Sequence, residues 1–189
     1  MRAGWLVWAA GWAGVLVAQE AAQEVGADRI TAAARETVEA AKYCFLITVD
    51  AAGEPQARLM EPLAPEADLT VWMGTKPDSR KVAQIRKNPR ASLACYHAKG
   101  PDYVTLIGRA RIVEDLAERR RRWRPGWEAF YPGGPEGKSY VLIELTPSRV
   151  EVISHTHTIA VDSPGPAMAV REKGRWVERA YPGAEGRGR

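Results

Sequence analysis

The stretch YCFLITVDAAGEPQARLME, residues 43–61, carries the clearest structural signal in the sequence. Residues 43–49 are rich in β-branched and aromatic side chains, residues 50–53 form a turn cluster, and residues 56–61 return to a strand-like pattern. This order predicts a β-hairpin. Similar runs predict further strands at residues 69–73, 91–97, 103–113, 140–146 and 149–154, the last two separated by Pro147 and Ser148. Many short strands with few helices favour a small antiparallel barrel over a parallel βαβ sheet.

Helices are expected at residues 28–41, 79–88 and 115–124. Asp28 can cap the first, whose apolar residues recur at helical spacing, and Asn88-Pro89 ends the second. Beyond Asp162 the sequence pattern predicts one hairpin, which ends near Trp176 and Val177. A Gly/Arg-rich tail follows, which we expect to be disordered.

The composition is that of an ordinary globular protein. The chain has 189 residues, of which 46% are hydrophobic and 26% are charged, and its net charge is +4. These values argue against a disordered or fibrous chain, and the length fits one domain with extensions. Two cysteines are too few for a disulfide scaffold and have no metal-binding spacing.

The N-terminus has the pattern of a secretory signal peptide. Arg2 is followed by the apolar run WLVWAAGWAGVLVA, residues 5–18, which ends before Gln19 and Glu20. The run is shorter than the roughly 20 residues of a membrane-spanning helix. We therefore expect a signal peptide at residues 1–18, with an approximate cleavage site, and an exported protein that is periplasmic or secreted.

After removal of the leader, no stable membrane insertion is expected. The alternative is an uncleaved apolar helix that anchors the protein to the membrane or packs in its core. The remaining chain divides into a predicted domain at residues 19–162 and a C-terminal extension at residues 163–189.

Cys44 and Cys95 lie in apolar, strand-like runs. Export would place both in an oxidising compartment. The favoured interpretation is that they are buried free thiols, which pack as small hydrophobic side chains. A bond between them requires neighbouring strands, which the sequence alone does not establish.

The densest charge in the chain is the arginine run at residues 119–122, together with Arg124. On a helix these side chains point in all directions and cannot form one basic stripe, so a solvated helix is the favoured interpretation. No interleaving of aromatic and basic residues supports nucleic-acid binding, and no nucleic-acid partner is expected. The segment GKS at residues 137–139 resembles the end of a phosphate-binding loop. It fails that pattern because Pro132 occupies a required glycine position and a strand follows.

His155 and His157 alternate, so on a strand their side chains share one face. A third metal ligand could be His97 or Asp162, but the sequence does not bring either of them to the pair. No metal site is therefore predicted.

The most informative segment for function is TKPDSRK, residues 75–81. A strand ends, a loop turns, and a helix begins at Ser79, so free backbone N–H groups and the positive end of the helix dipole are expected there. Ser79 adds a hydroxyl, and Arg80 and Lys81 add two cations, which together suffice for a phosphate site. The alternative is an ordinary helix start with surface basic residues. Arg58 strengthens the phosphate hypothesis because it lies mid-strand, where a cation among barrel-lining residues needs an anionic partner.

Over residues 28–155 the sequence resembles the pyridoxamine 5′-phosphate oxidase-like, FMN-binding split β-barrel superfamily. The resemblance lies in the order and spacing of TVDAAGEPQARLMEP, a further strand, TKPDSRK, NPRASLACY and IGRARIV. The FYPGG segment before LIELTPSRVEV is most similar to the general-stress-protein branch. The resemblance implies a mainly β (α+β) fold, a six- to seven-stranded antiparallel split barrel with a few flanking helices.

The resemblance also implies a homodimer that holds FMN in clefts at the subunit interface. The strand arginine of the family falls on Arg58, and its phosphate-binding S-R-K falls on Ser79, Arg80 and Lys81. The family's threonine before that loop falls on Thr75.

For the flavin ring, the resemblance implies that the backbone of Leu59 and Met60 lies beside the isoalloxazine edge. The glutamine often found near the ring falls on Tyr103, which is a departure from the family pattern. Leu63 stands where the vitamin B6 oxidases carry a lysine, and the tail AYPGAEGRGR lacks their Arg-x-His pair. True pyridoxamine-phosphate oxidase activity is therefore not expected.

The sequence thus predicts an FMN-binding split-barrel protein with flavin-dependent oxidoreductase activity on an unknown small-molecule substrate. No catalytic acid or base can be named. The alternative is a non-enzymatic binding or carrier module for flavin, haem or a deazaflavin cofactor, in which His155 and His157 could ligate haem.

Overall fold

The computed structural model describes residues 25–97 and 100–181. The predicted signal peptide and the end of the Gly/Arg-rich tail lie outside the described residues. The helices are α1 (Ala27–Ala40), α2 (Arg80–Lys87) and α3 (Leu116–Arg121), with two short 3-10 helices, η1 (Trp127–Ala129) and η2 (Gly134–Glu136). The strands are β1 (Cys44–Val49), β2 (Pro55–Met60), β3 (Val71–Thr75), β4 (Arg90–His97), β5 (Asp102–Val113), β6 (Val141–Ile153), β7 (Ala167–Glu172) and β8 (Arg175–Arg179). None of the described helices combines the length and the apolar character needed to cross a membrane.

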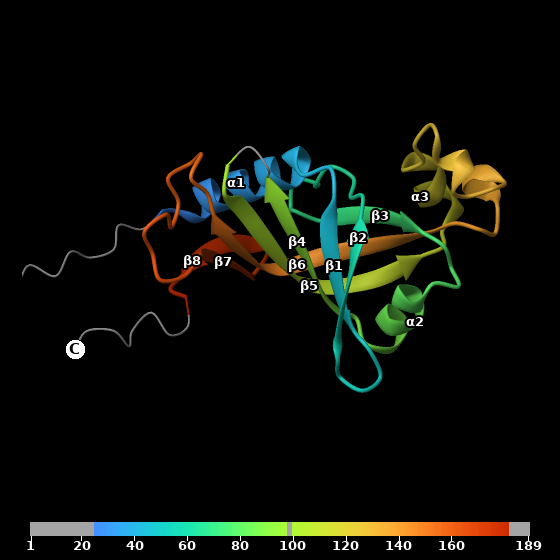
Figure 1. The fold of residues 1–189 in the computed structure, drawn as a ribbon, viewed down its shortest axis with the longest axis horizontal. Coiled ribbons are helices and arrows are strands. Elements are labelled where there is room, and N and C mark those ends of the chain that lie inside the picture. Colours follow the sequence, from blue (N-terminus) through green and yellow to red (C-terminus); the bar gives the residue numbers. More distant parts are fainter. Residues whose placement is uncertain (1–24, 98–99, 182–189) are drawn as a thin grey trace, which may run out of the picture.

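The described strands form one antiparallel sheet of eight, in the order β2-β1-β4-β5-β6-β7-β8, and β3 pairs with β6 off this path. Figure 1 shows α1 across one end of the coiled sheet, α2 beside the long β1–β2 hairpin, and α3 beyond β3. The predicted mainly β, antiparallel split-barrel architecture is confirmed. The strand number exceeds six or seven because the expected C-terminal hairpin, β7–β8, joins the same sheet.

One predicted strand boundary is wrong, because residues 140–146 and 149–154 belong mostly to a single strand, β6. The register between β5 and β6 shifts, so that Pro147 stands opposite Gly108 and Ser148 is the extra residue of a bulge. A bulge is one of the few places where a strand tolerates proline. Gly108 is required there, since a Cβ atom on it would lie 2.2 Å from the carbonyl oxygen of Thr146.

The sheet has an inward and an outward face because side chains alternate along each strand. Leu46, Leu93, Leu106 and Val150 stand opposite one another across β1, β4, β5 and β6, and all four are fully buried. These residues form the middle of the main core. The helix α1 covers this core with the buried residues Ile30, Ala33, Ala34, Thr37 and Val38. The alternate residues of the same strands form the outward face.

A smaller aromatic cluster attaches α3 and the two 3-10 helices to β3 and β6. Trp127 and Tyr140 lie edge to face with ring centroids 5.6 Å apart, and Trp72 is buried in the same cluster. Gly74 lies under it, since a Cβ atom there would come within 2.8 Å of the Trp127 ring. The aromatic rings approach the backbone of β3 closely, which explains why a glycine stands within this strand.

The arginine run of α3 is not uniformly solvated, so that interpretation is wrong for two members, Arg119 and Arg122. The side chains of Arg120 and Arg121 are 55% and 63% exposed, but that of Arg122 is only 10% exposed. Its guanidinium lies 3.5 Å from the centroid of the Trp72 ring and donates to Glu66 at 2.6 Å. The guanidinium of Arg119 lies 5.6 Å from the centroid of the Tyr140 ring in the same cluster. Because a helix presents side chains on all sides, these two arginines face the aromatic cluster, where cation–π contacts stabilise them.

Cys44 and Cys95 form a disulfide, so the interpretation as free thiols is wrong. The two residues are direct cross-strand partners on β1 and β4, with Cα atoms 4.5 Å apart. Both are buried in the main core. The error arose because β1 and β4 are neighbours only in the folded sheet, with β2, β3 and α2 between them in sequence.

We expect the double substitution Cys44→Ala and Cys95→Ala to lower the free energy of unfolding by about 2–5 kcal/mol. The crosslink spans 51 residues of sequence and therefore restricts the unfolded chain. Urea unfolding followed by tryptophan fluorescence measures the change. Dithiothreitol should lower the unfolding midpoint of the unaltered protein and leave the double variant unchanged. Equal shifts in both proteins would contradict a structural disulfide.

Candidate anion-binding site

Arg58 is a partly buried cation on the inward side of β2. It stands opposite the buried Leu46, so its side chain projects toward the same side as the core. Its guanidinium donates to the carbonyl oxygen of Leu46 at 3.2 Å, to Oγ1 of Thr48 at 2.6 Å and to Oε1 of Gln84 at 2.8 Å. All three acceptors are neutral oxygens. They orient the guanidinium without neutralising its charge.

Thr48 and Gln84 support Arg58 from two different elements, β1 and α2. The hydroxyl of Thr48 also donates to Oε1 of Gln84 at 2.7 Å, so one amide oxygen accepts bonds from both neighbours. The sequence interpretation missed both residues. Two signals were present: Thr48 follows Leu46 on the inward side of β1, and Gln84 lies one helical turn after Arg80.

The start of α2 provides hydroxyl and backbone groups. Ser79 occupies the N-cap position with an extended backbone, and no described side chain caps this helix. The hydroxyl of Ser79 lies 3.4 Å from that of Thr75, which is buried at the end of β3. The first backbone N–H groups of a helix have no partner within the helix and face outward with the positive end of its dipole. Thr75, Ser79 and this helix start therefore form one polar surface.

Three cations meet at this surface. Burial and then the charge of Arg80 lower the pKa of Arg58. Burial and then Arg58 lower the pKa of Lys81, an effect that Asp78 opposes. Among the described residues, no carboxylate forms an ion pair with Arg58, Arg80 or Lys81 within 4.0 Å. The three cations repel one another, and this repulsion is relieved when an anion binds between them.

The structure thus brings together the five residues expected to bind phosphate: Arg58, Thr75, Ser79, Arg80 and Lys81. It provides charge, hydroxyls and backbone donors, which suit a phosphate group. Since these groups offer positive charge and hydrogen-bond donors, the arrangement is suited to binding an anion.

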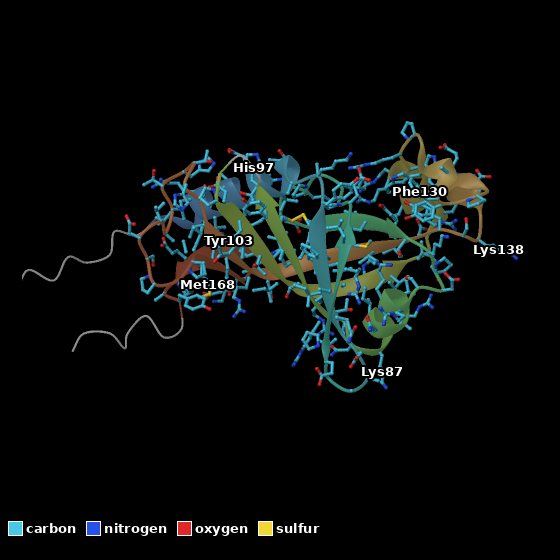
Figure 2. All side chains as sticks on the ribbon, in the orientation of Figure 1. Lys87, His97, Tyr103, Phe130, Lys138 and Met168 are labelled. Atoms are coloured by element: carbon cyan, nitrogen blue, oxygen red, sulfur yellow. A yellow bond between two sulfur atoms is a disulfide. The ribbon has the colours of Figure 1, made fainter. Side chains whose placement is uncertain are left out.

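Of the residues expected near a flavin ring, Leu59 and Met60 directly follow Arg58 on β2, whereas Tyr103 lies apart on β5. Leu59 is 54% exposed on the outward side of β2, and Met60 is buried opposite Cys44. Tyr103 is 37% exposed on the outward side at the start of β5. Figure 2 shows Tyr103 near Met168, away from Lys87 at the end of α2. A single chain does not place Tyr103 beside the three cations.

The histidines have structural partners. Nε2 of His157 lies 2.8 Å from a carboxylate oxygen of Glu36 on α1. The backbone N–H of His155 donates to the buried Asp102 at 2.6 Å. Within residues 25–97 and 100–181, no three histidine, cysteine or acidic side chains gather in a way that could hold a metal ion.

The solved structures most similar in fold include several stress proteins. General stress protein 26 from Bacillus anthracis str. Sterne is 24% identical with a TM-score of 0.56, covering 67% of this chain and 92% of its own. A Clostridium acetobutylicum protein related to general stress protein 26, of the pyridoxinephosphate oxidase family, is 23% identical with a TM-score of 0.60, covering 68% and 89%. A pyridoxamine 5′-phosphate oxidase-related, FMN-binding protein from Nostoc punctiforme is 19% identical with a TM-score of 0.56, covering 80% and 94%. At these identities the likeness shows a shared fold.

The comparison with curated proteins gives no match. The family comparison does: the model described as pyridoxamine 5′-phosphate oxidase matches residues 30–154, which include both the β1–β2 hairpin and the start of α2. Since this match spans more than half of the chain and contains the whole cation cluster, the protein belongs to the pyridoxamine 5′-phosphate oxidase family.

Proposed function

We propose that this protein binds FMN and uses it for oxidation or reduction of a small molecule. The observation that carries the proposal is the group of Arg58, Arg80 and Lys81 at the uncapped start of α2. These cations have no carboxylate partner among the described residues. Family membership supports the proposal, as does the Nostoc relative, which is described as FMN-binding.

In this proposal the phosphate of FMN lies against Ser79, Arg80 and Lys81, and Arg58 reaches it from β2. The hydroxyl of Thr75 and the backbone of Leu59 and Met60 complete the binding surface. Bound FMN would supply the electron-transfer chemistry, and the chain would bind it, orient it and exclude water. A deazaflavin with a phosphate group would use the same surface.

Leu63 argues against a vitamin B6 substrate. The vitamin B6 oxidases carry a lysine at the corresponding position. Here the side chain of Leu63 packs against the aromatic cluster, so an apolar core residue stands in place of that lysine. The substrate is better sought among other small molecules.

We also propose that the outward face forms a homodimer. Phe45 and Leu59 are cross-strand partners, as are Tyr96 and Tyr103, and all four are exposed on this face. Exposed apolar groups gathered on one face mark an interaction surface. A second copy would cover them and bring its Tyr103 near the flavin cleft of the first.

Export is proposed from two observations. The apolar run after Arg2 has the pattern of a signal peptide. The Cys44–Cys95 disulfide is stable in an oxidising compartment and rare in the cytosol.

The phosphate role is tested with Arg58→Gln. Loss of the charge should raise the Kd for FMN about 10- to 100-fold, the equivalent of about 1.5–3 kcal/mol for a charge-assisted hydrogen bond. Quenching of FMN fluorescence measures binding, and Arg175→Gln on the exposed β8 is the matched control. The site would be refuted if the unaltered protein did not bind FMN, or if Arg58→Gln bound it equally well.

Flavin reduction by NADH or NADPH then distinguishes an oxidoreductase from a carrier that binds flavin without turnover.

A second prediction concerns Gln84→Glu. The new carboxylate would pair with Arg58 and occupy the charge that the phosphate needs, so we expect FMN affinity to fall at least about tenfold. Gln84→Ala removes the support without adding charge and should reduce affinity less. The same titration measures both variants. A larger loss of FMN affinity in Gln84→Glu than in Gln84→Ala would show that Arg58 needs an uncharged hydrogen-bond partner. A Gln84→Glu variant that binds FMN normally would contradict it.

The dimer is tested by the double substitution Phe45→Asp and Tyr96→Asp. Two charges in the proposed interface should convert the dimer to a monomer in light-scattering measurements after gel filtration. Phe130→Asp is the control, because Phe130 is also exposed but lies at the opposite end of the molecule from Tyr103 (Figure 2). A monomeric unaltered protein, or a double variant that stays dimeric, would overturn this interface.

A further inference from the structure

The outward face carries a hollow that the proposed cofactor site does not use. It lies where the end of β1 and the start of β4 meet the middle of β5, away from Tyr103, and its volume is about 400 Å³. Ile47, Val49 and Ile107 provide apolar side chains. Gly108 and Ser148 border it at the bulge between β5 and β6. A hollow of this size with an apolar floor suits a small ligand.

Two arginines border the same hollow. Arg90 and Arg109 also line it, and they are direct cross-strand partners on β4 and β5. Like charges placed opposite each other on one face of a sheet are destabilising. Both side chains are exposed, and no described carboxylate lies within ion-pair distance of either one. The repulsion is therefore not offset within the described part of the chain.

The neighbouring arginines of this face are arranged differently. Arg111 forms an ion pair with Glu144, and Arg149 forms one with Glu151 at 3.1 Å. Two of the four outward arginines on β4, β5 and β6 thus have a carboxylate beside them. Arg90 and Arg109 have none within ion-pair distance in the described part of the chain, and they border the apolar hollow.

A second copy of the chain does not supply the missing charge from its own outward face. Among the described strands β1, β2, β4, β5 and β6, the outward carboxylates are Glu144 and Glu151, and both already pair with arginines. The carboxylate of Asp102 points inward and accepts bonds from residues 154–156. The outward strands of a second copy would therefore leave Arg90 and Arg109 without a carboxylate, which favours a small ligand as the source of the charge.

We propose that this hollow binds a small amphipathic carboxylate, with the carboxylate between Arg90 and Arg109. Its apolar body would cover Ile47, Val49 and Ile107. Two guanidinium groups on adjacent strands can each donate to one carboxylate, and the relief of their repulsion adds to its affinity. The site is separate from the phosphate site, since Arg58 projects inward from β2 whereas Arg90 and Arg109 project outward. The proposal therefore does not depend on FMN binding.

The experiment is calorimetric titration of the full chain with octanoate, with 1-octanol and acetate as probes for the apolar and anionic parts alone. Octanoate should bind with one site per chain, and the other two should bind at least about tenfold more weakly. The double substitution Arg90→Gln and Arg109→Gln should weaken octanoate at least about tenfold. Ile107→Ser should also weaken it, whereas Arg175→Gln should not change it.

Several outcomes would overturn the proposal. These are no octanoate binding by the unaltered protein, equal binding of 1-octanol, or full binding by the double arginine variant. The double variant should keep its unfolding temperature or gain slightly, because two like charges are removed, so that loss of binding is not loss of fold. FMN titration of the same samples keeps the two sites distinguishable: failure of one titration leaves the other unaffected.

Discussion

The register between β1 and β2 is the constraint on which the rest of the site depends. It places Arg58 opposite Leu46, on the side that faces the core and α2. Because strand side chains alternate, a shift of one residue would send Arg58 to the outward face and bring Leu59 inward. Arg58 would then lie away from Arg80 and Lys81. The short turn at residues 50–53, in which Asp50 accepts hydrogen bonds from the backbone of Ala52 and Glu54, holds that register.

Local signals predicted much of this structure. The hairpin, the helix that starts after Ser79 and the long strand that begins near Tyr103 all follow from residue patterns within a few positions. The five residues of the phosphate site were also predictable, because four of them lie in one heptapeptide, residues 75–81, and Arg58 is an unusual residue for the middle of a strand. Non-local pairing was not predictable in the same way. Cys44 meets Cys95 only because β1 and β4 are neighbours, and Pro147 remains within a strand only because Gly108 of β5 accommodates a bulge.

Supporting residues were the hardest to identify. Gln84 and Thr48 look like ordinary surface and strand residues, and their role exists only where α2 crosses the end of β1. The environment of Arg122 was equally hard to predict, because it depends on Trp72, which lies 50 positions earlier in the sequence. Such residues are defined by tertiary contacts between elements rather than by any pattern along the chain.

The neutral oxygens that hold Arg58 have a consequence for how binding responds to acidity. Neither a guanidinium nor an amide nor a hydroxyl changes protonation between about pH 5 and 8. Nε2 of His157 contacts Glu36, outside the cluster. A phosphate ester, in contrast, gains its second negative charge near pH 6. Around Arg58 and its neutral partners, the pH dependence of binding between about pH 5 and 8 is therefore set by the ionisation of the bound phosphate, because the positive charge of Arg58 is constant over this range.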